Sequence, residues 1–183
     1  MKGDTYELLQ FHWHFQSEHA VDGKHKNGEM HFVFALSCFS TTTCAANKGL
    51  AVVGVFLERT ESGSDSDLFK KISEWAQGGN DLGFNFQTDV LDKGPSSGGF
   101  WHYLGSLTTP PCSEIVEWIV LKQPLQLGSV VFDEFKKHSF EHTQKGYKSG
   151  KSFTFNGANV TSGDENNRPI QPLSGRAITT TLK

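Results

Sequence analysis

The chain has 183 residues, of which 36% are hydrophobic and 20% charged, and its formal net charge is −3 at pH 7. This balance excludes a disordered polar tail, and the absence of a basic excess excludes nucleic acid as the expected partner. The mean hydropathy is −0.41, and apolar stretches such as residues 50–57 fall far short of the roughly 20 residues that a membrane-spanning helix needs. With 15 Phe, 19 Gly and 2 Met, the composition favours a sheet-rich fold with many turns.

Two strands are predicted near the start of the chain. Residues 6–15 alternate between two faces, because successive side chains of a strand point in opposite directions. The predicted faces are Leu9, Phe11, Trp13 and Phe15 on one side, and Leu8, Gln10, His12 and His14 on the other. A polar loop with turn signals leads to residues 29–34, where Glu29, His31 and Val33 share a face.

Later segments alternate between short strands, short helices and loops. We predict a buried strand at 49–58, an amphipathic helix at 67–77, Gly-rich loops to about 99, an irregular stretch at 103–111, a strand at 114–122 that ends before Pro124, a helix at 129–138 and a short strand at 177–182. No internal repeat is present. The expected fold class is α+β, mainly β: a single domain over residues 1–183, built around a large, mostly antiparallel central sheet with a few short peripheral helices.

Three histidines stand out on these strands. His12 and His14 project from one face about 6.6 to 6.8 Å apart, and His31 lies on the corresponding face of the next strand. Three imidazoles without a thiolate or carboxylate are the ligand set of a catalytic zinc ion with an open fourth position. Gln10 and Glu29 share these faces and are placed to accept hydrogen bonds from the imidazoles. The alternative is that all five are ordinary, partly solvated strand residues.

The motifs around these histidines resemble the α-class carbonic anhydrases. The resemblance rests on residues 10–15 (QFHWHF), 17–23 (SEHAVDG), 29–33 (EMHFV), 49–57 (GLAVVGVFL), 103–114 (YLGSLTTPPCSE), 118–122 (WIVLK) and 167–173 (NRPIQPL). It extends over nearly the whole chain. It implies reversible hydration of carbon dioxide to bicarbonate and a proton by zinc-bound hydroxide.

The resemblance also implies a role for individual residues. His12, His14 and His31 match the zinc ligands, Gln10 and Glu29 match the residues that hold them, and Thr108 with Glu18 matches the gate that orients the hydroxide. Thr109 matches the adjacent substrate-side position. The apolar wall that takes carbon dioxide is matched by Val33, Val52, Leu107, Val116 and Trp118. His19, Tyr103 and Arg168 match structural supports.

Other expectations also follow from the resemblance. It begins inside the family's domain, so the N-terminal part, including the usual proton-shuttle histidine, has no counterpart. The 183 residues alone are therefore expected either to be markedly unstable and slow or to be completed by a partner chain or a swapped copy. None of His25, His102, His138 or His142 sits at the shuttle position. Cys112 falls where secreted members carry half of a disulfide. Together with the glycan acceptor at 159–161, this predicts a secreted glycoprotein with a disulfide, and a cytoplasmic location is the alternative.

The alternatives to an active hydratase stay open at the level of sequence. They are a zinc esterase, an inactive or weakly active zinc-binding matrix or binding protein, and a metal-free structural relative. Metal-free relatives lose one or more of the histidines, and all three stand here. As ligands, the resemblance implies carbon dioxide and bicarbonate, with sulfonamides and anions as inhibitors.

Overall fold

The computed structural model describes residues 5–36, 49–61, 67–76, 83–93, 95–136, 153–155, 158–160 and 167–181. Its centre is a six-stranded sheet with the order β1-β4-β5-β7-β6-β10. The strands are β1 (Tyr6–Phe15), β4 (Gly28–Leu36), β5 (Leu50–Thr60), β6 (Phe100–Gly105), β7 (Val116–Gly128) and β10 (Thr179–Thr180). All neighbours pair antiparallel except β5 and β7, which pair in parallel. The predicted fold class is therefore confirmed.

Two short hairpins and several helical segments surround this sheet. The hairpins pair β2 (Ala20–Val21) with β3 (Lys24–His25), and β8 (Phe153–Phe155) with β9 (Ala158–Val160). The helices are α1 (Asp67–Ala76) and α2 (Phe86–Asp89), followed by the 3-10 turns η1 (Leu91–Lys93) and η2 (Pro95–Gly98), and residues 129–136 are also helical. Within the described part of the chain, no helix is long and apolar enough to cross a membrane.

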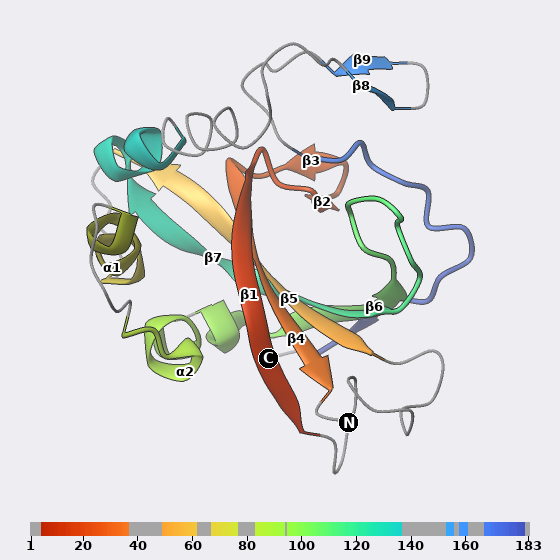
Figure 1. Cartoon of the computed structure of the whole chain (residues 1–183), viewed down its shortest axis with the longest axis horizontal. Helices are drawn as coiled ribbons and strands as arrows, with labels where there is room; N and C mark the ends of the chain where they lie inside the picture. The colour runs from red at the N-terminus through yellow and green to blue at the C-terminus, as the bar shows by residue number, and fades with distance from the viewer. Residues whose placement is uncertain are drawn as a thin grey trace.

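The two faces of the sheet differ in what covers them. In Figure 1, α1, α2 and the helix at 129–136 lie on one side of the sheet, while β2, β3 and the β6–β7 connection lie on the other. On the helical side, Phe32, Leu68, Ile72 and Phe135 belong to one large buried cluster. This packing fixes one face of β1 and β4 and leaves the opposite face of the same strands free for other chemistry.

Two features of the strands differ from the sequence prediction. The register of β1 against β4 shifts between Leu8 and Gln10. This bulge turns Leu8 into the helical-side core and leaves Leu9 56% exposed, which reverses the predicted faces of these two leucines. Strand β7 runs on through Pro124, beside a second register shift at residues 55–57 of β5, where a missing ladder N–H is tolerated.

The stretch at 103–111 is also more regular than predicted. Tyr103 to Gly105 complete β6, whose pairing with β7 runs to Gly105 opposite Val116. The irregular part begins only after Gly105 and contains the cis peptide bond between Pro110 and Pro111. The predicted helix at 129–138 agrees with the structure over 129–136, and its last two residues lie outside the described part.

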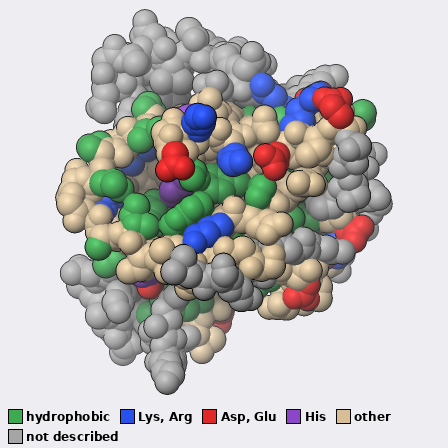
Figure 2. All heavy atoms as spheres, turned by 180° about the vertical axis from the view of Figure 1, so that it is seen from behind, with side chains coloured by type: hydrophobic (Ala, Val, Ile, Leu, Met, Phe, Trp, Pro, Cys, Tyr) green, Lys and Arg blue, Asp and Glu red, His purple; other side chains and the backbone are tan. Residues whose placement is uncertain are grey.

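Charges of both signs are mixed on the described surface. Figure 2 shows acidic and basic side chains interspersed with hydrophobic ones on the face seen there. This distribution matches the small net charge of the whole chain. On that face, the described residues form no broad field of a single sign of the kind that steers polyanions to a protein.

Candidate metal centre

The three predicted zinc ligands lie together on β1 and β4. The antiparallel register pairs His12 with His31 and His14 with Glu29. The ring centroids of the three histidines are 5.1, 5.2 and 4.8 Å apart, and one nitrogen of each ring lies within 4.8 Å of the others. His14 and His31 are buried, and His12 is half-buried. The sheet therefore places three imidazoles around one point that is reached from the side of His12.

Oxygen atoms beside two of these rings favour the tautomer that offers a lone pair to a metal. His12 Nδ1 lies 2.9 Å from the amide oxygen of Gln10 and is hydrogen-bonded to it. His31 Nε2 lies 3.0 Å from Glu29 Oε1, a close charge contact without hydrogen-bond geometry. Since an oxygen of this kind only accepts, the ring proton belongs on the nitrogen that faces it, and the other nitrogen keeps its lone pair. Burial, with the neighbouring rings of His31 and His14, lowers the pKa of His12 to about 3, so this ring is neutral at pH 7. Neutral imidazoles are what zinc binds.

Glu29 is the centre of a buried hydrogen-bond network behind His31. Its carboxylate is fully buried and accepts from the backbone N–H of His19 at 2.8 Å and from His19 Nδ1 at 2.6 Å. Burial opposes its charge, but the charges of His19 and His31 and the hydrogen bond from the His19 ring outweigh burial, so the pKa of Glu29 lies well below 4.5. Tyr103 extends the network, with its hydroxyl 2.6 Å from His19 Nε2. Glu29 is thus an anion held in one position against His31.

A glycine makes room for this carboxylate, and the sequence analysis did not identify it. A Cβ at Gly54 would lie 2.7 Å from Glu29 Oε1. Gly54 pairs with His31 across β4 and β5, so it lies directly beside the network. The only signal in the sequence is a glycine inside an apolar strand, which indicates a close approach without telling what approaches.

Glu18 lies beside two of the three histidines, whereas no contact of Thr108 with the cluster is seen among the described residues. Glu18 Oε2 is 3.5 Å from His14 Nε2 and 3.8 Å from His31 Nδ1. Within the described residues, Glu18 Oε1 accepts from the backbone N–H of Arg168 at 2.7 Å, and no hydrogen bond links Glu18 to Thr108. Thr108 is half-buried and Thr109 is exposed. The paired gate that the resemblance implies stays a prediction.

The predicted apolar wall forms one cluster on the histidine face of the sheet. Val33, two residues beyond His31, pairs with Val52, and Val52 pairs with Trp118. All five predicted wall residues belong to this cluster, with Val33, Val52, Val116 and Trp118 buried and Leu107 packed against them. The Trp118 ring lies 4.8 Å from that of His31, edge-on, so the metal centre and the apolar cluster share a boundary.

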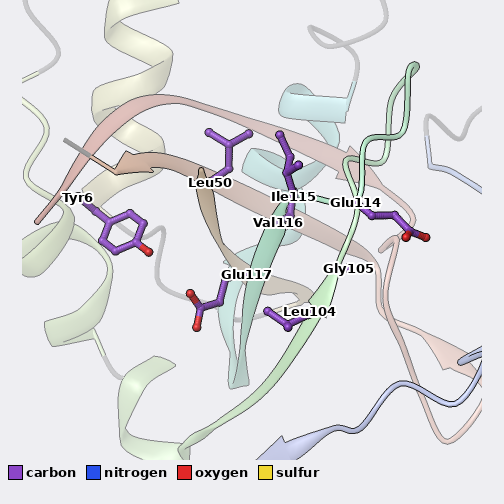
Figure 3. A pocket seen from close by; sticks show the side chains of 8 residues that line it. All are labelled: Tyr6, Leu50, Leu104, Gly105, Glu114, Ile115, Val116 and Glu117. Carbon is purple, nitrogen blue, oxygen red and sulfur yellow. The ribbon is translucent and has the colours of Figure 1, made fainter. Parts of the chain in front are cut away.

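A pocket at one end of the sheet is separate from the three histidines. It measures about 300 Å³ and is lined by Tyr6, Leu50, Leu104, Gly105, Glu114, Ile115, Val116 and Glu117. Figure 3 shows these side chains coming from the start of β1, β5 and β7, the end of β6 and the β6–β7 connection. Val116 is the one predicted wall residue that also lines this pocket.

Comparison with known proteins identifies the family. The eukaryotic-type carbonic anhydrase family matches residues 1–182. The chain belongs to this family. It is 34% identical over 177 residues to a carbonic anhydrase of Klebsiella pneumoniae, covering 96% of the chain and 58% of that protein. Human carbonic anhydrase 7 is 33% identical over 192 residues, covering 94% of the chain and 64% of the relative.

A solved structure gives the same assignment. The α-carbonic anhydrase of Thermovibrio ammonificans, determined in complex with the inhibitor sulfanilamide, superposes with a TM-score of 0.66 at 31% identity, covering 97% of this chain and 64% of that one. The chain thus spans about 60% of the length of the relatives it matches. The resemblance seen in the sequence is confirmed at the level of the family.

Several other sequence predictions stay predictions. Cys112, the one cysteine within the described residues, forms no disulfide there, and Cys38 and Cys44 lie outside them. Asn159 lies in β9, where the side chains are not described, and His138 and His142 fall outside the described residues. Secretion, glycosylation and a completing partner chain are likewise expectations from the sequence.

Proposed function

We propose that the chain binds one zinc ion through His12, His14 and His31 and catalyses the reversible hydration of carbon dioxide to bicarbonate and a proton. The observation that supports this most strongly is the convergence of three imidazoles, two of them buried, with no thiolate among the described residues of the cluster. This donor set suits zinc and leaves an open coordination position. When bound in such a site, zinc lowers the pKa of a coordinated water to about 7 and so supplies a nucleophile at neutral pH.

The other residues of the site have distinct tasks in this proposal. Gln10 and Glu29 keep the rings of His12 and His31 in the tautomer and orientation that a metal needs. Glu18 and Thr108 orient the attacking oxygen, since a hydroxyl that donates to a carboxylate can only accept from a second partner. The cluster around Val52 and Trp118 receives carbon dioxide, which is small and apolar.

Metal analysis combined with a hydration assay tests this proposal. We expect about one zinc per chain and hydration of carbon dioxide that a chelator abolishes and added zinc restores. His14→Ala should lose both the zinc and the activity, because the cluster is reduced to two ligands. His102→Ala is a matched control, since His102 bonds Glu117 on the opposite face of the sheet. Sulfanilamide, which is bound in the Thermovibrio relative, should inhibit through the same site.

Two results would count against the proposal in different ways. Protein purified without chelator that contains no zinc, and takes up none, would overturn the metal centre. Zinc held by the three histidines without any hydration of carbon dioxide would leave a zinc-binding carbonic-anhydrase-like protein, the alternative that the sequence left open. In protein that holds zinc but does not hydrate carbon dioxide, an assay with an activated ester distinguishes a zinc esterase from an inactive zinc-binding protein.

A further inference from the structure

The segment that begins at residue 167 touches the two connections that carry the predicted gate residues. Asn167 Nδ2 donates to Gln16 Oε1 at 3.3 Å, and the backbone N–H of Arg168 donates to Glu18 Oε1 at 2.7 Å. Arg168 Nη1 also donates to the hydroxyl of Ser106 at 3.4 Å. Figure 1 shows this C-terminal segment running past β2 and β3 toward the β6–β7 connection. Arg168 is thereby hydrogen-bonded to Glu18, 150 positions away in the sequence, and to Ser106, 62 positions away.

Glu18 depends on this segment for its orientation. Its side chain is 5% exposed, and within the described residues the Arg168 N–H is the only hydrogen-bond donor to its carboxylate. The other oxygen, Oε2, is buried without a hydrogen bond and faces His14 and His31. A short bond from a backbone N–H to a carboxylate is among the stronger hydrogen bonds in proteins. Holding Oε1 therefore determines where Oε2 points.

The contact with Ser106 links the same residue to the connection that carries Thr108. Ser106 lies two positions before Thr108, and its carbonyl oxygen accepts from Trp118 Nε1 at 3.1 Å. The backbone of the next residue, Leu107, donates to Ser113 at 3.0 Å, which closes the connection into a compact loop. Arg168 thus forms hydrogen bonds with both the loop that contains Glu18 and the loop that contains Thr108.

From these contacts we infer that Arg168 is a positioning residue: its backbone N–H fixes the Glu18 carboxylate so that one oxygen is held and the other faces the metal centre. This inference rests on the proposed function, because it assigns a role within that site. Arg168 does not touch the reacting atoms. Its contribution to turnover is to keep Glu18 where a misplacement of about 1 Å could cost up to a hundredfold in rate.

A pair of substitutions at one position separates the N–H from the side chain. Arg168→Ala removes the guanidinium and keeps the N–H, whereas Arg168→Pro removes both. Residue 168 already precedes Pro169, so its backbone is biased toward the extended region that proline also adopts. In zinc-loaded protein we expect Arg168→Pro to lower kcat about 10- to 100-fold relative to Arg168→Ala, with zinc content and KM unchanged. Equal kcat in the two variants would overturn the inference.

A measurement on the metal-free protein tests the hydrogen bond without any activity. Amide hydrogen exchange at residue 168 should be slow in the wild type and about tenfold faster or more in Glu18→Ala, since that variant removes the acceptor. Fast exchange in the wild type, or unchanged exchange in the variant, overturns the inference. This measurement also decides the question if Arg168→Pro does not fold. Hydrogen exchange also remains informative if the wild type binds zinc but does not hydrate carbon dioxide. That outcome would reject the proposed function and not the hydrogen bond between residue 168 and Glu18.

Discussion

At the scale of single residues, the arrangement of the three histidines depends on side chains outside their cluster. Glu29 is fully buried and charged, and it is tolerated because His19 donates two hydrogen bonds to it and the ring of His31 lies 3.0 Å away. Burial works against a charged His19, but the charge and hydrogen bond of Glu29 prevail and raise the pKa of His19 above 6.5. This ring, together with Tyr103, backs the carboxylate. The orientation of a ligand is thus set by a chain of partners that extends away from it.

Removing the hydroxyl of Thr108 should slow hydration without loss of metal. We expect Thr108→Ala to lower kcat roughly 10- to 1,000-fold, the range for loss of one positioned hydrogen bond in a transition state. Zinc content should stay at the wild-type level, because no ligand is touched. Thr108→Ser is the matched control, since it keeps the hydroxyl and should keep most of the activity. Unchanged turnover of Thr108→Ala, followed by stopped-flow spectroscopy, would show that Thr108 is only a loop residue.

A methyl group at position 54 should displace Glu29 and thereby weaken zinc binding by His31. In Gly54→Ala the new Cβ would lie 2.7 Å from Glu29 Oε1, and the buried carboxylate must move away from His31. We expect zinc affinity to fall about 10- to 100-fold, as it does when a group that holds a metal-binding histidine is displaced. Competition with a chromophoric chelator measures this change. Wild-type affinity in Gly54→Ala would mean that Glu29 does not orient His31.

At the scale of elements, strand periodicity predicted what depends on local sequence. The alternation at residues 6–15 and 29–34 placed three histidines on one face, and the antiparallel pairing of His12 with His31 bears out that geometry. The bulge at Leu8–Gln10 and the passage of β7 through Pro124 were not predicted. Both depend on how a neighbouring strand is registered, which a single strand does not encode.

The same distinction applies to the residues around the metal centre. Glu18 and Thr108 were identified only through the resemblance, because in sequence they are an ordinary loop charge and a turn residue. The contact between Arg168 and Glu18 spans 150 positions and uses a backbone N–H. A backbone group leaves no trace in the identity of a side chain, so no pattern in the sequence could have indicated it.

One ion pair should contribute more than others to the packing of the helices. Lys71 Nζ of α1 lies 2.7 and 2.9 Å from the two oxygens of Asp89 in α2, whose side chain is 6% exposed. Asp89 Oδ2 also accepts from the backbone of Asn85. Lys71→Met would leave the buried carboxylate without its cation. We expect the free energy of unfolding to fall by about 1 to 3 kcal/mol. The loss should be smaller than for a fully buried pair, because Lys71 is partly exposed to solvent.

A surface pair provides the control for this experiment. Lys26 Nζ lies 3.5 Å from Glu58 Oε1, and both side chains are more than a third exposed. Lys26→Met should therefore cost less than about 1 kcal/mol. Denaturation in urea measures both variants under the same conditions. Equal losses for the two variants would contradict the view that burial of Asp89 makes the α1–α2 pair important.

At the scale of the whole molecule, the central sheet separates stability from chemistry. One face of β4 and β5 packs against the helices through the cluster that contains Phe32, Val53 and Val55. The other face carries His31 together with the cluster that contains Val33 and Val52. Adjacent residues of a strand thus belong to different layers, and a substitution at either one reports on its own face.

Enlarging each of two neighbouring valines tests this separation. Val52 is 2% exposed on the histidine face and Val53 is 8% exposed on the helical face. Phenylalanine at either position overfills a packed cluster, so both Val52→Phe and Val53→Phe should lower the free energy of unfolding by about 1 to 3 kcal/mol.

Only Val52→Phe should also affect the reaction, because Val52 pairs with Trp118, whose ring contacts His31. We expect its kcat/KM for carbon dioxide hydration to fall at least about tenfold, as a larger side chain occupies the apolar site beside the metal. Val53→Phe should keep the wild-type kcat/KM at a temperature where both variants are folded. Zinc analysis of each variant verifies that the metal is retained. Similar losses of kcat/KM in both variants would show that the two faces of the sheet are not independent, and that the wall cluster has no special relation to the substrate.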